Sequence, residues 1–104
     1  MSSKNATDML VAKRIIVSGK VQGVGFRYGL AEVARGLHIW GWCRNVPDGT
    51  VEAFLQGEAG RMAQVLEWIR QGPPGARVQQ VRIEDQAVLE PMLEETIQVF
   101  EIRR

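Results

Sequence analysis

The order of hydrophobic and polar positions along the chain predicts a succession of strands and helices. Residues 14–18 are rich in β-branched side chains and stop at Gly19, which is typical of a strand. In two later segments, apolar residues recur at helical spacing and form one stripe each. The stripes are Phe26, Leu30, Val33 and Leu37 in the first segment, and Met62, Val65, Leu66 and Ile69 in the second. A Gly-Pro-Pro-Gly run at 72–75 ends the second helix.

The remaining pattern predicts a hairpin and two more strands. The turn signal Pro47-Asp48-Gly49 separates two strand-like segments, 39–45 and 50–56, and the three together predict a hairpin. A further strand is expected over 78–83 and a closing strand over 97–102. Between them, residues 86–95 contain Pro91 and several acids, so we expect a loop there.

This β-α-β-β-α-β order, with one short extra edge strand, predicts an α+β fold of the split-βαβ type, in which two helices cover one face of an antiparallel sheet. In that arrangement the first two strands both run antiparallel to the third, so they run parallel to each other. Their carboxyl ends then meet at one edge of the sheet. We therefore expect the loop over 21–26 to lie beside Asn45, which ends the second strand.

The loop between the first strand and the first helix has the composition of an anion site. Backbone N–H groups at a helix N-terminus have no intrahelical partner, and with the helix dipole they attract phosphate. Gly23 and Gly25 permit positive φ, and Arg27 in the first turn could reach the same anion with its planar fork. The alternative is a tight turn with a surface arginine. The loop lacks the Gly-Lys-Ser/Thr of a Walker motif, and Tyr28 stands where a dinucleotide fingerprint needs a small residue.

Composition and charge narrow the class of protein. The 104 residues suit one domain, which we expect over 13–104, after a flexible leader over 1–12. The net charge of +1 favours neither nucleic acid nor a membrane surface as partner. With one Cys and one His, no disulfide, metal site or cofactor is predicted. The leader contains no long apolar run, so we expect a cytoplasmic protein. We also expect a monomer.

Three blocks of the sequence resemble the acylphosphatase family, and the resemblance covers roughly residues 13–104. The blocks are Val21-Gln22-Gly23-Val24-Gly25-Phe26-Arg27, Gly41-Trp42-Cys43-Arg44-Asn45 and Asp48-Gly49-Thr50-Val51-Glu52, and the end of the chain, Phe100 to Arg104, is also similar. The resemblance implies a ferredoxin-like fold and hydrolysis of acyl phosphates. It implies that Arg27 binds the substrate, that Asn45 positions a water, and that the backbone of residues 22–27 holds the phosphate: Gln22, Gly23, Val24, Gly25, Phe26 and Arg27.

The chemistry of such a substrate fits the few groups available. An acyl phosphate is a mixed anhydride whose carboxylate leaving group has a conjugate acid of pKa about 4, so it departs without a general acid. Positioning and electrostatic stabilisation then suffice, and no metal is required. The expected ligands are a small acyl phosphate and, at the same loop, inorganic phosphate or sulfate.

Other residues and other functions are weaker candidates. His38 takes the position where the family has the glycine that ends the first helix, which concerns helix stability more than catalysis. Cys43 shares the strand face of Asn45 and is expected to pack, because no basic partner is evident. Trp40 and Trp42 share the other face. The acids Glu84, Asp85, Glu90, Glu94 and Glu95 are expected to form a solvated face.

Three alternative functions use the same fold. An RNA-recognition domain needs aromatic residues on its third strand and a basic surface, and here that strand offers only Phe54. A carbamoyl-phosphate site like that of hydrogenase-maturation carbamoyltransferases is one part of a much longer chain. A small-molecule regulatory domain is the third alternative, and activity on a synthetic acyl phosphate would discriminate against it.

Overall fold

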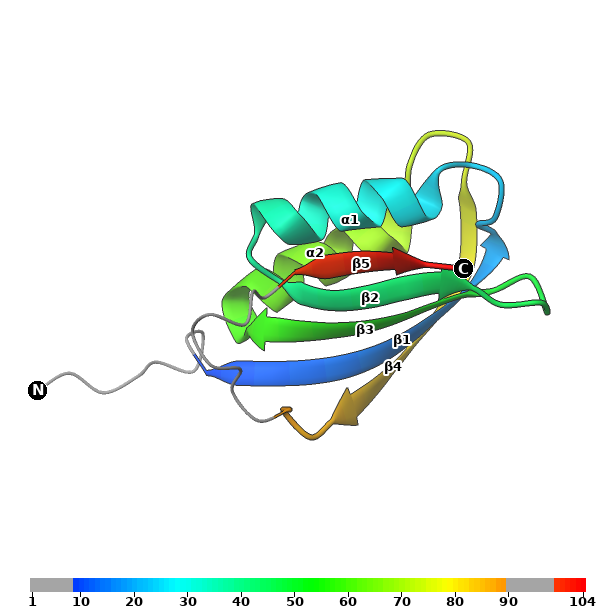
Figure 1. Cartoon of the computed structure of the whole chain (residues 1–104). Coiled ribbons are helices and arrows are strands. Elements are labelled where there is room, and N and C mark those ends of the chain that lie inside the picture. Colours follow the sequence, from blue (N-terminus) through cyan, green and yellow to red (C-terminus); the bar gives the residue numbers. More distant parts are fainter. Residues whose placement is uncertain (1–8, 90–98) are drawn as a thin grey trace, which may run out of the picture.

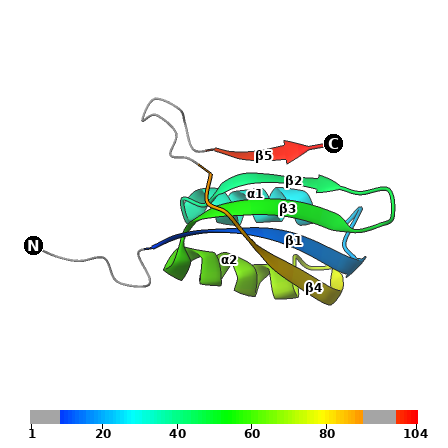
Figure 2. The same ribbon diagram turned by 90° about the horizontal axis from the view of Figure 1, so that it is seen from below.

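Two helices cover one face of a five-stranded sheet (Figure 1). The structure, a computed structural model, describes residues 9–89 and 99–104. Its elements are β1 (Leu10–Lys20), α1 (Phe26–Gly36), β2 (Trp40–Asn45), β3 (Val51–Glu58), α2 (Ala59–Gln71), β4 (Arg77–Gln86) and β5 (Phe100–Arg103). The strand order is β4-β1-β3-β2-β5, and β3 pairs antiparallel with both β1 and β2. The predicted ferredoxin-like α+β fold is confirmed (Figure 2).

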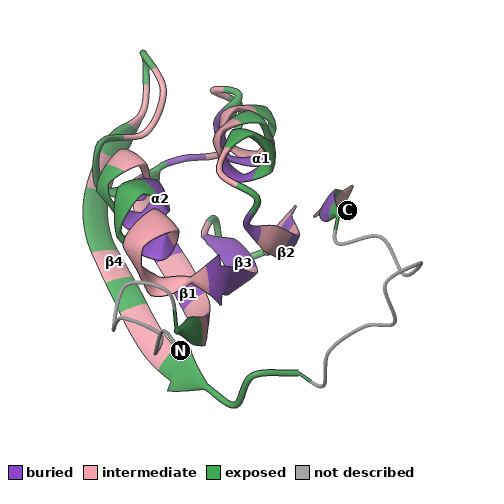
Figure 3. Cartoon of the chain, turned by 90° about the vertical axis from the view of Figure 1, so that its left-hand side faces the viewer, coloured by how far each residue is buried: buried purple, intermediate pink, exposed green. Residues whose placement is uncertain are grey.

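The hydrophobic core lies between the helices and the sheet (Figure 3). Alternate residues of β3, namely Val51, Ala53 and Leu55, are at most 1% exposed and belong to this core. Both predicted helical stripes take part in it, although Val33 and Leu37 are only half-buried. The hydrophobic periodicity therefore identified the correct face of each helix.

Gly29 in the middle of α1 has a packing role. Glycine in a helix interior costs about 1 kcal/mol relative to alanine. Here Trp68 of α2 lies against the α1 backbone, and a Cβ added at Gly29 would sit 2.7 Å from the Trp68 ring. The same indole packs against Phe26, with ring centroids 5.3 Å apart. The glycine thus allows the two helices to approach each other closely.

The end of α1 confirms the prediction for His38. Its φ is 56°, in the left-handed region where glycine is usual. The His38 Nδ1 atom lies 2.7 Å from a terminal nitrogen of Arg61, which also contacts the Leu37 carbonyl oxygen. A side chain of α2 therefore contacts the residue that ends α1.

Two features of the sheet differ from the prediction. The sheet is mixed, because β5 pairs parallel with β2, in the register Gly41↔Phe100. The prediction of an entirely antiparallel sheet was therefore wrong. The order of elements along the chain does not specify at which edge an extra strand pairs, or in which direction it runs. Second, β1 begins at Leu10, within the segment expected to be leader, because its first residues pair with the end of β3. The described part of the closing strand begins at Phe100, and Gln86 belongs to β4; residues 1–8 and 90–98 lie outside the described residues.

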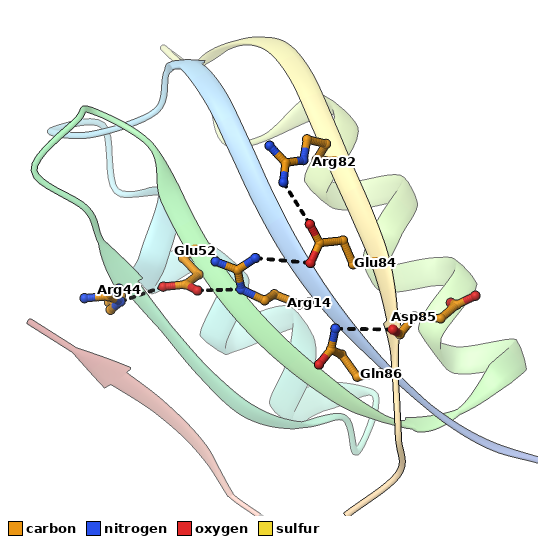
Figure 4. Close-up of polar contacts among 7 residues, drawn as sticks. All are labelled: Arg14, Arg44, Glu52, Arg82, Glu84, Asp85 and Gln86. Carbon is orange, nitrogen blue, oxygen red and sulfur yellow. Dashed lines mark hydrogen bonds and ion pairs between the residues drawn. The ribbon is translucent and has the colours of Figure 1, made fainter.

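The face of the sheet opposite the helices carries a chain of ion pairs (Figure 4). The Glu52 carboxylate accepts hydrogen bonds from Nε of Arg14 and Nε of Arg44, each at 2.7 Å. Arg14 also donates to Glu84 at 3.1 Å, and Arg82 donates to the same carboxylate at 2.8 Å. The chain of pairs links β2, β3, β1 and β4. The Glu52 side chain is 8% exposed, whereas Arg14 and Arg44 are 38% and 43% exposed.

Candidate active site

The loop after β1 and the end of β2 meet at one edge of the sheet, as the topology predicted (Figure 1). They enclose a cavity of about 160 Å³, lined by Val21, Gly23, Gly25, Phe26, Arg27, Tyr28 and Asn45. Antiparallel pairing of β3 with both strands explains the meeting, because it aligns the carboxyl ends of β1 and β2. The catalytic roles of these residues remain predictions.

The loop beside this cavity has backbone amides without a protein acceptor, and Gly23, Gly25, Phe26 and Arg27 line the cavity, whereas Gln22 and Val24 do not. Gly23 and Gly25 have φ of 75° and 81°, so both use the conformation that favours glycine. Gly25 is the N-cap of α1. Among the described residues, the amides of Gly23 to Arg27 donate to no protein acceptor. At the positive end of the α1 dipole, such amides can bind a tetrahedral anion.

Arg27 lines the cavity from the first turn of α1. One of its terminal nitrogens donates to the backbone carbonyl oxygen of Arg103 at 3.0 Å. The guanidinium also lies 5.9 Å from the centre of the exposed Tyr28 ring. A guanidinium has five N–H donors, so this contact leaves others for an anion. The contact with β5 was not predicted, because a carbonyl contact carries no side-chain signature in the sequence.

Asn45, the last residue of β2, lines the same cavity. Its Oδ1 atom is enclosed and has no hydrogen-bond partner among the described residues. A buried acceptor without a partner is unfavourable in a stable fold. The described residues therefore leave the Asn45 Oδ1 atom as an acceptor without a donor.

The turn that follows Asn45 is closed by its own polar side chains. The Asp48 carboxylate accepts hydrogen bonds from the Thr50 hydroxyl at 2.7 Å and from the Thr50 amide at 3.0 Å. The hydroxyl hydrogen bond is the main reason that the pKa of Asp48 lies below its ordinary value. A side chain of the loop after β1 also reaches this turn, since Gln22 donates to the carbonyl oxygens of Val46 and Thr50. Sequence reasoning assigned only the backbone of Gln22 and missed this contact.

The other candidate residues do not enter the cavity. Cys43 is completely buried, and burial raises the pKa of its thiol to about 12, although Arg27 acts in the opposite direction. His38 lies at the far end of α1, beside a larger cavity of about 260 Å³ that also contains Arg35 and Phe100. The helix dipole is negative at that end, which disfavours an anion there.

The remaining candidate residues that the structure describes form ion pairs or pack against other side chains. Glu84 is half-buried in the ion-pair chain and Asp85 pairs with Lys13, while Glu90, Glu94 and Glu95 lie outside the described residues. Trp40 packs edge-on against Phe54 at 6.1 Å between centroids. Among residues 9–89 and 99–104, no three His, Cys, Asp or Glu side chains are placed to hold a metal ion. In the same residues, no helix is long and apolar enough to cross a membrane.

Comparison with known proteins agrees with this geometry. A family model described as Acylphosphatase matches residues 13–102. An acylphosphatase of Acaryochloris marina is 40% identical over 95 residues, which cover 91% of this chain and 96% of that protein. The crystal structure of acylphosphatase from Bacillus subtilis has a TM-score of 0.81 at 33% identity and covers 92% of this chain and 100% of that one. Full-length HypF in a phosphate- and nucleotide-bound form shares the fold, with a TM-score of 0.79 at 24% identity, but only 12% of its length is covered.

Proposed function

The chain belongs to the acylphosphatase family, and we propose that it hydrolyses acyl phosphates to a carboxylate and inorganic phosphate by metal-free attack of a positioned water. The observation that carries the proposal is the cavity shared by the loop amides, Arg27 and Asn45. The carbamoyl-phosphate alternative is not favoured, because the acylphosphatases of Acaryochloris marina and Bacillus subtilis match along nearly their whole length, whereas HypF is covered only in part.

In this proposal the loop and Arg27 bind the phosphoryl group. The amides of residues 23–27 and the guanidinium surround the phosphoryl oxygens, where negative charge must be stabilised during transfer. Charge-assisted hydrogen bonds from arginine to phosphate are the strongest contacts available here. The hydrogen bond from Arg27 to the Arg103 carbonyl oxygen restricts the guanidinium before the substrate arrives, so less entropy is lost on binding.

Asn45 holds the attacking water in this proposal. Its unpartnered Oδ1 atom supports the role, since a water can donate to it. A carboxamide is a poor base, so the proton of the water passes to a phosphate oxygen of the substrate. The carboxylate leaving group needs no proton, because its conjugate acid has a pKa of about 4. The chemistry therefore runs on positioning and charge stabilisation.

The test is hydrolysis of benzoyl phosphate by the purified chain, with and without excess EDTA, beside an alkyl phosphate monoester. We expect hydrolysis of the acyl phosphate, no effect of EDTA and little activity on the monoester, whose alkoxide leaving group needs an acid. Inorganic phosphate should compete and shift the amide signals of residues 22–27. Loss of activity on chelation, restored by Mg²⁺ or Zn²⁺, would reject the metal-free mechanism.

The proposal also includes a monomer in the cytoplasm. The single cysteine, Cys43, is a buried thiol, so it cannot form a disulfide between folded copies. Elution as a dimer in gel filtration would contradict the proposed monomer.

A further inference from the structure

The Gln22 side chain joins the two halves of the cavity. Its Nε2 atom donates to the carbonyl oxygen of Val46 at 2.7 Å and to that of Thr50 at 2.8 Å. A carboxamide nitrogen carries two hydrogens, so both are used. Gln22 itself lies in residues 22–27, the phosphate loop of the proposed function, and Val46 directly follows Asn45.

The two acceptors are the ends of the turn between β2 and β3. The Val46 amide donates to the Thr50 carbonyl oxygen and the Gly49 amide donates to the Val46 carbonyl oxygen, each at 2.9 Å. Gln22 binds the second lone pair of both carbonyl groups. Both ends of the turn, one of which directly follows Asn45, are therefore hydrogen-bonded to Gln22.

The strand pairing explains why this link is needed. β1 and β2 do not pair with each other, because β3 lies between them. The register of β1 with β3 ends at Val17↔Val51, and beyond it β1 pairs only with β4, up to Lys20↔Arg77. No backbone ladder then joins the phosphate loop to the turn after β2. Among the described residues, the two Gln22 hydrogen bonds are the only side-chain hydrogen bonds between segments 21–25 and 45–50.

We propose that Gln22 is a positioning residue whose side chain sets the placement of Asn45 relative to the phosphate loop. The inference rests on the proposed function, in which Asn45 holds the water and the loop holds the phosphoryl group. The water must stand in line with the bond that breaks, and a displacement of about 1 Å can cost roughly a hundredfold in rate. Gln22 acts on turnover through Asn45, while the amides of residues 23–27 bind the phosphoryl group.

The test is a double-mutant cycle with Gln22→Leu, Asn45→Ala and the variant carrying both changes. Leucine removes the two donors and keeps the backbone amide. We expect Gln22→Leu to lower kcat by about tenfold to a hundredfold. The inhibition constant of phosphate should change less than about threefold, because the loop amides and Arg27 remain. In the Asn45→Ala background, Gln22→Leu should lower kcat by no more than about twofold, because the residue it positions is gone.

Gln56→Leu is the matched control. Gln56 also makes two hydrogen bonds to backbone, with Leu89, and it is 2% exposed. It pairs with Trp40 at the start of β2, whereas Asn45 ends that strand. Gln56→Leu should reduce stability and leave kcat within about twofold. An equal loss of kcat in both Gln22→Leu backgrounds, or a parallel loss of phosphate affinity, would overturn the proposal.

A second readout does not depend on turnover. In NMR spectra of the folded protein, Gln22→Leu should shift or broaden the Asn45 side-chain amide and the Val46 amide, while Gln56→Leu should leave them unchanged. Unperturbed signals in Gln22→Leu would reject the inference even if the chain hydrolyses acyl phosphates. Absence of hydrolysis by the wild type would instead reject the proposed function, with the spectra still deciding the role of Gln22.

Discussion

Replacement of Glu52 by glutamine should destabilise the fold without entering the active site. Glu52 accepts hydrogen bonds from Arg14 and Arg44 on the open face of the sheet. Glutamine has nearly the same shape as glutamate, but its carboxamide is neutral. It has a single oxygen, which can accept a hydrogen bond from only one of the two arginines. The amide nitrogen would face the other guanidinium, so one contact turns from attractive to unfavourable.

The magnitude follows from the burial of the three side chains. Breaking a fully buried ion pair costs about 3–5 kcal/mol, whereas an exposed pair contributes about 0.2–1 kcal/mol. Glu52 is 8% exposed but its two arginines are 38% and 43% exposed, so they can turn to water. We therefore expect a loss of about 2 kcal/mol in the free energy of unfolding, or a Tm lower by about 10 °C for a domain of this size.

The pH dependence has a definite sign. Burial alone would raise the pKa of Glu52, but hydrogen bonds from Arg44 and Arg14 outweigh it and leave the pKa below its ordinary value. A carboxyl group with a depressed pKa stabilises the fold above its unfolded pKa of about 4.3 and loses this contribution as the pH falls through the folded pKa. The difference between wild type and Glu52→Gln should be constant from about pH 8 to 5 and shrink below about pH 4.

The assay is urea unfolding of both proteins across this pH range, with Glu84→Gln as control. Glu84 contacts Arg14 and Arg82 through a side chain that is 37% exposed, so its replacement should cost less. Turnover of acyl phosphate should be retained in both folded variants. A difference between wild type and Glu52→Gln that stays the same from pH 7 to pH 3, or equal losses in the two variants, would refute this account.

Three further predictions concern the cavity and the core. Arg27→Ala should weaken phosphate binding and reduce kcat/KM by at least about a hundredfold, whereas Asn45→Ala should reduce kcat and leave phosphate affinity nearly intact. Phosphate inhibition measured beside kcat separates the two roles. An equal loss of phosphate affinity in both variants would contradict separate roles for Arg27 and Asn45. Gly29→Ala should lower Tm despite the better helix propensity of alanine, because the new methyl group meets Trp68, and an unchanged or higher Tm in a thermal melt would disprove the close contact. Cys43 should react with iodoacetamide at pH 8 only after unfolding, because its pKa is about 12 and it is buried; rapid labelling of the native protein, followed by mass spectrometry, would contradict this.

The secondary structure was predictable because a single buried face imposes its period on the sequence. The helical stripes and the alternation in β3 mark residues that contact one layer, and each is local in the chain. The pattern could not show that β3 is buried on both faces. Counted over backbone and side chain together, Glu52 and Gln56 are 6% and 2% exposed. They are covered by arginines of other strands and by Leu89, which sequence spacing does not bring together.

The candidate site was predictable where it depends on residue type. The two glycines, Arg27 and Asn45 each supply a property that few other residues have: positive φ, a planar charged fork, or a carboxamide at a strand end. The contacts that hold these groups in place were not predictable. Arg27 is held by the carbonyl oxygen of Arg103, which any residue at that position would offer, and Gln22 acts through distances that only the folded turn defines.

The strand order has a consequence for how the chain folds. Strand β1 pairs with β3 and β4, so its partners lie far along the chain, as in Leu10↔Glu58 and Ala12↔Gln86. Only β2 and β3 pair as sequence neighbours. Long segments must close before these distant pairings stabilise anything, which makes folding slow compared with a helical protein of the same length. The loop after β1 and the end of β2 meet only when β3 lies between their strands, so the proposed site forms with the long-range β1–β3 pairing and not before.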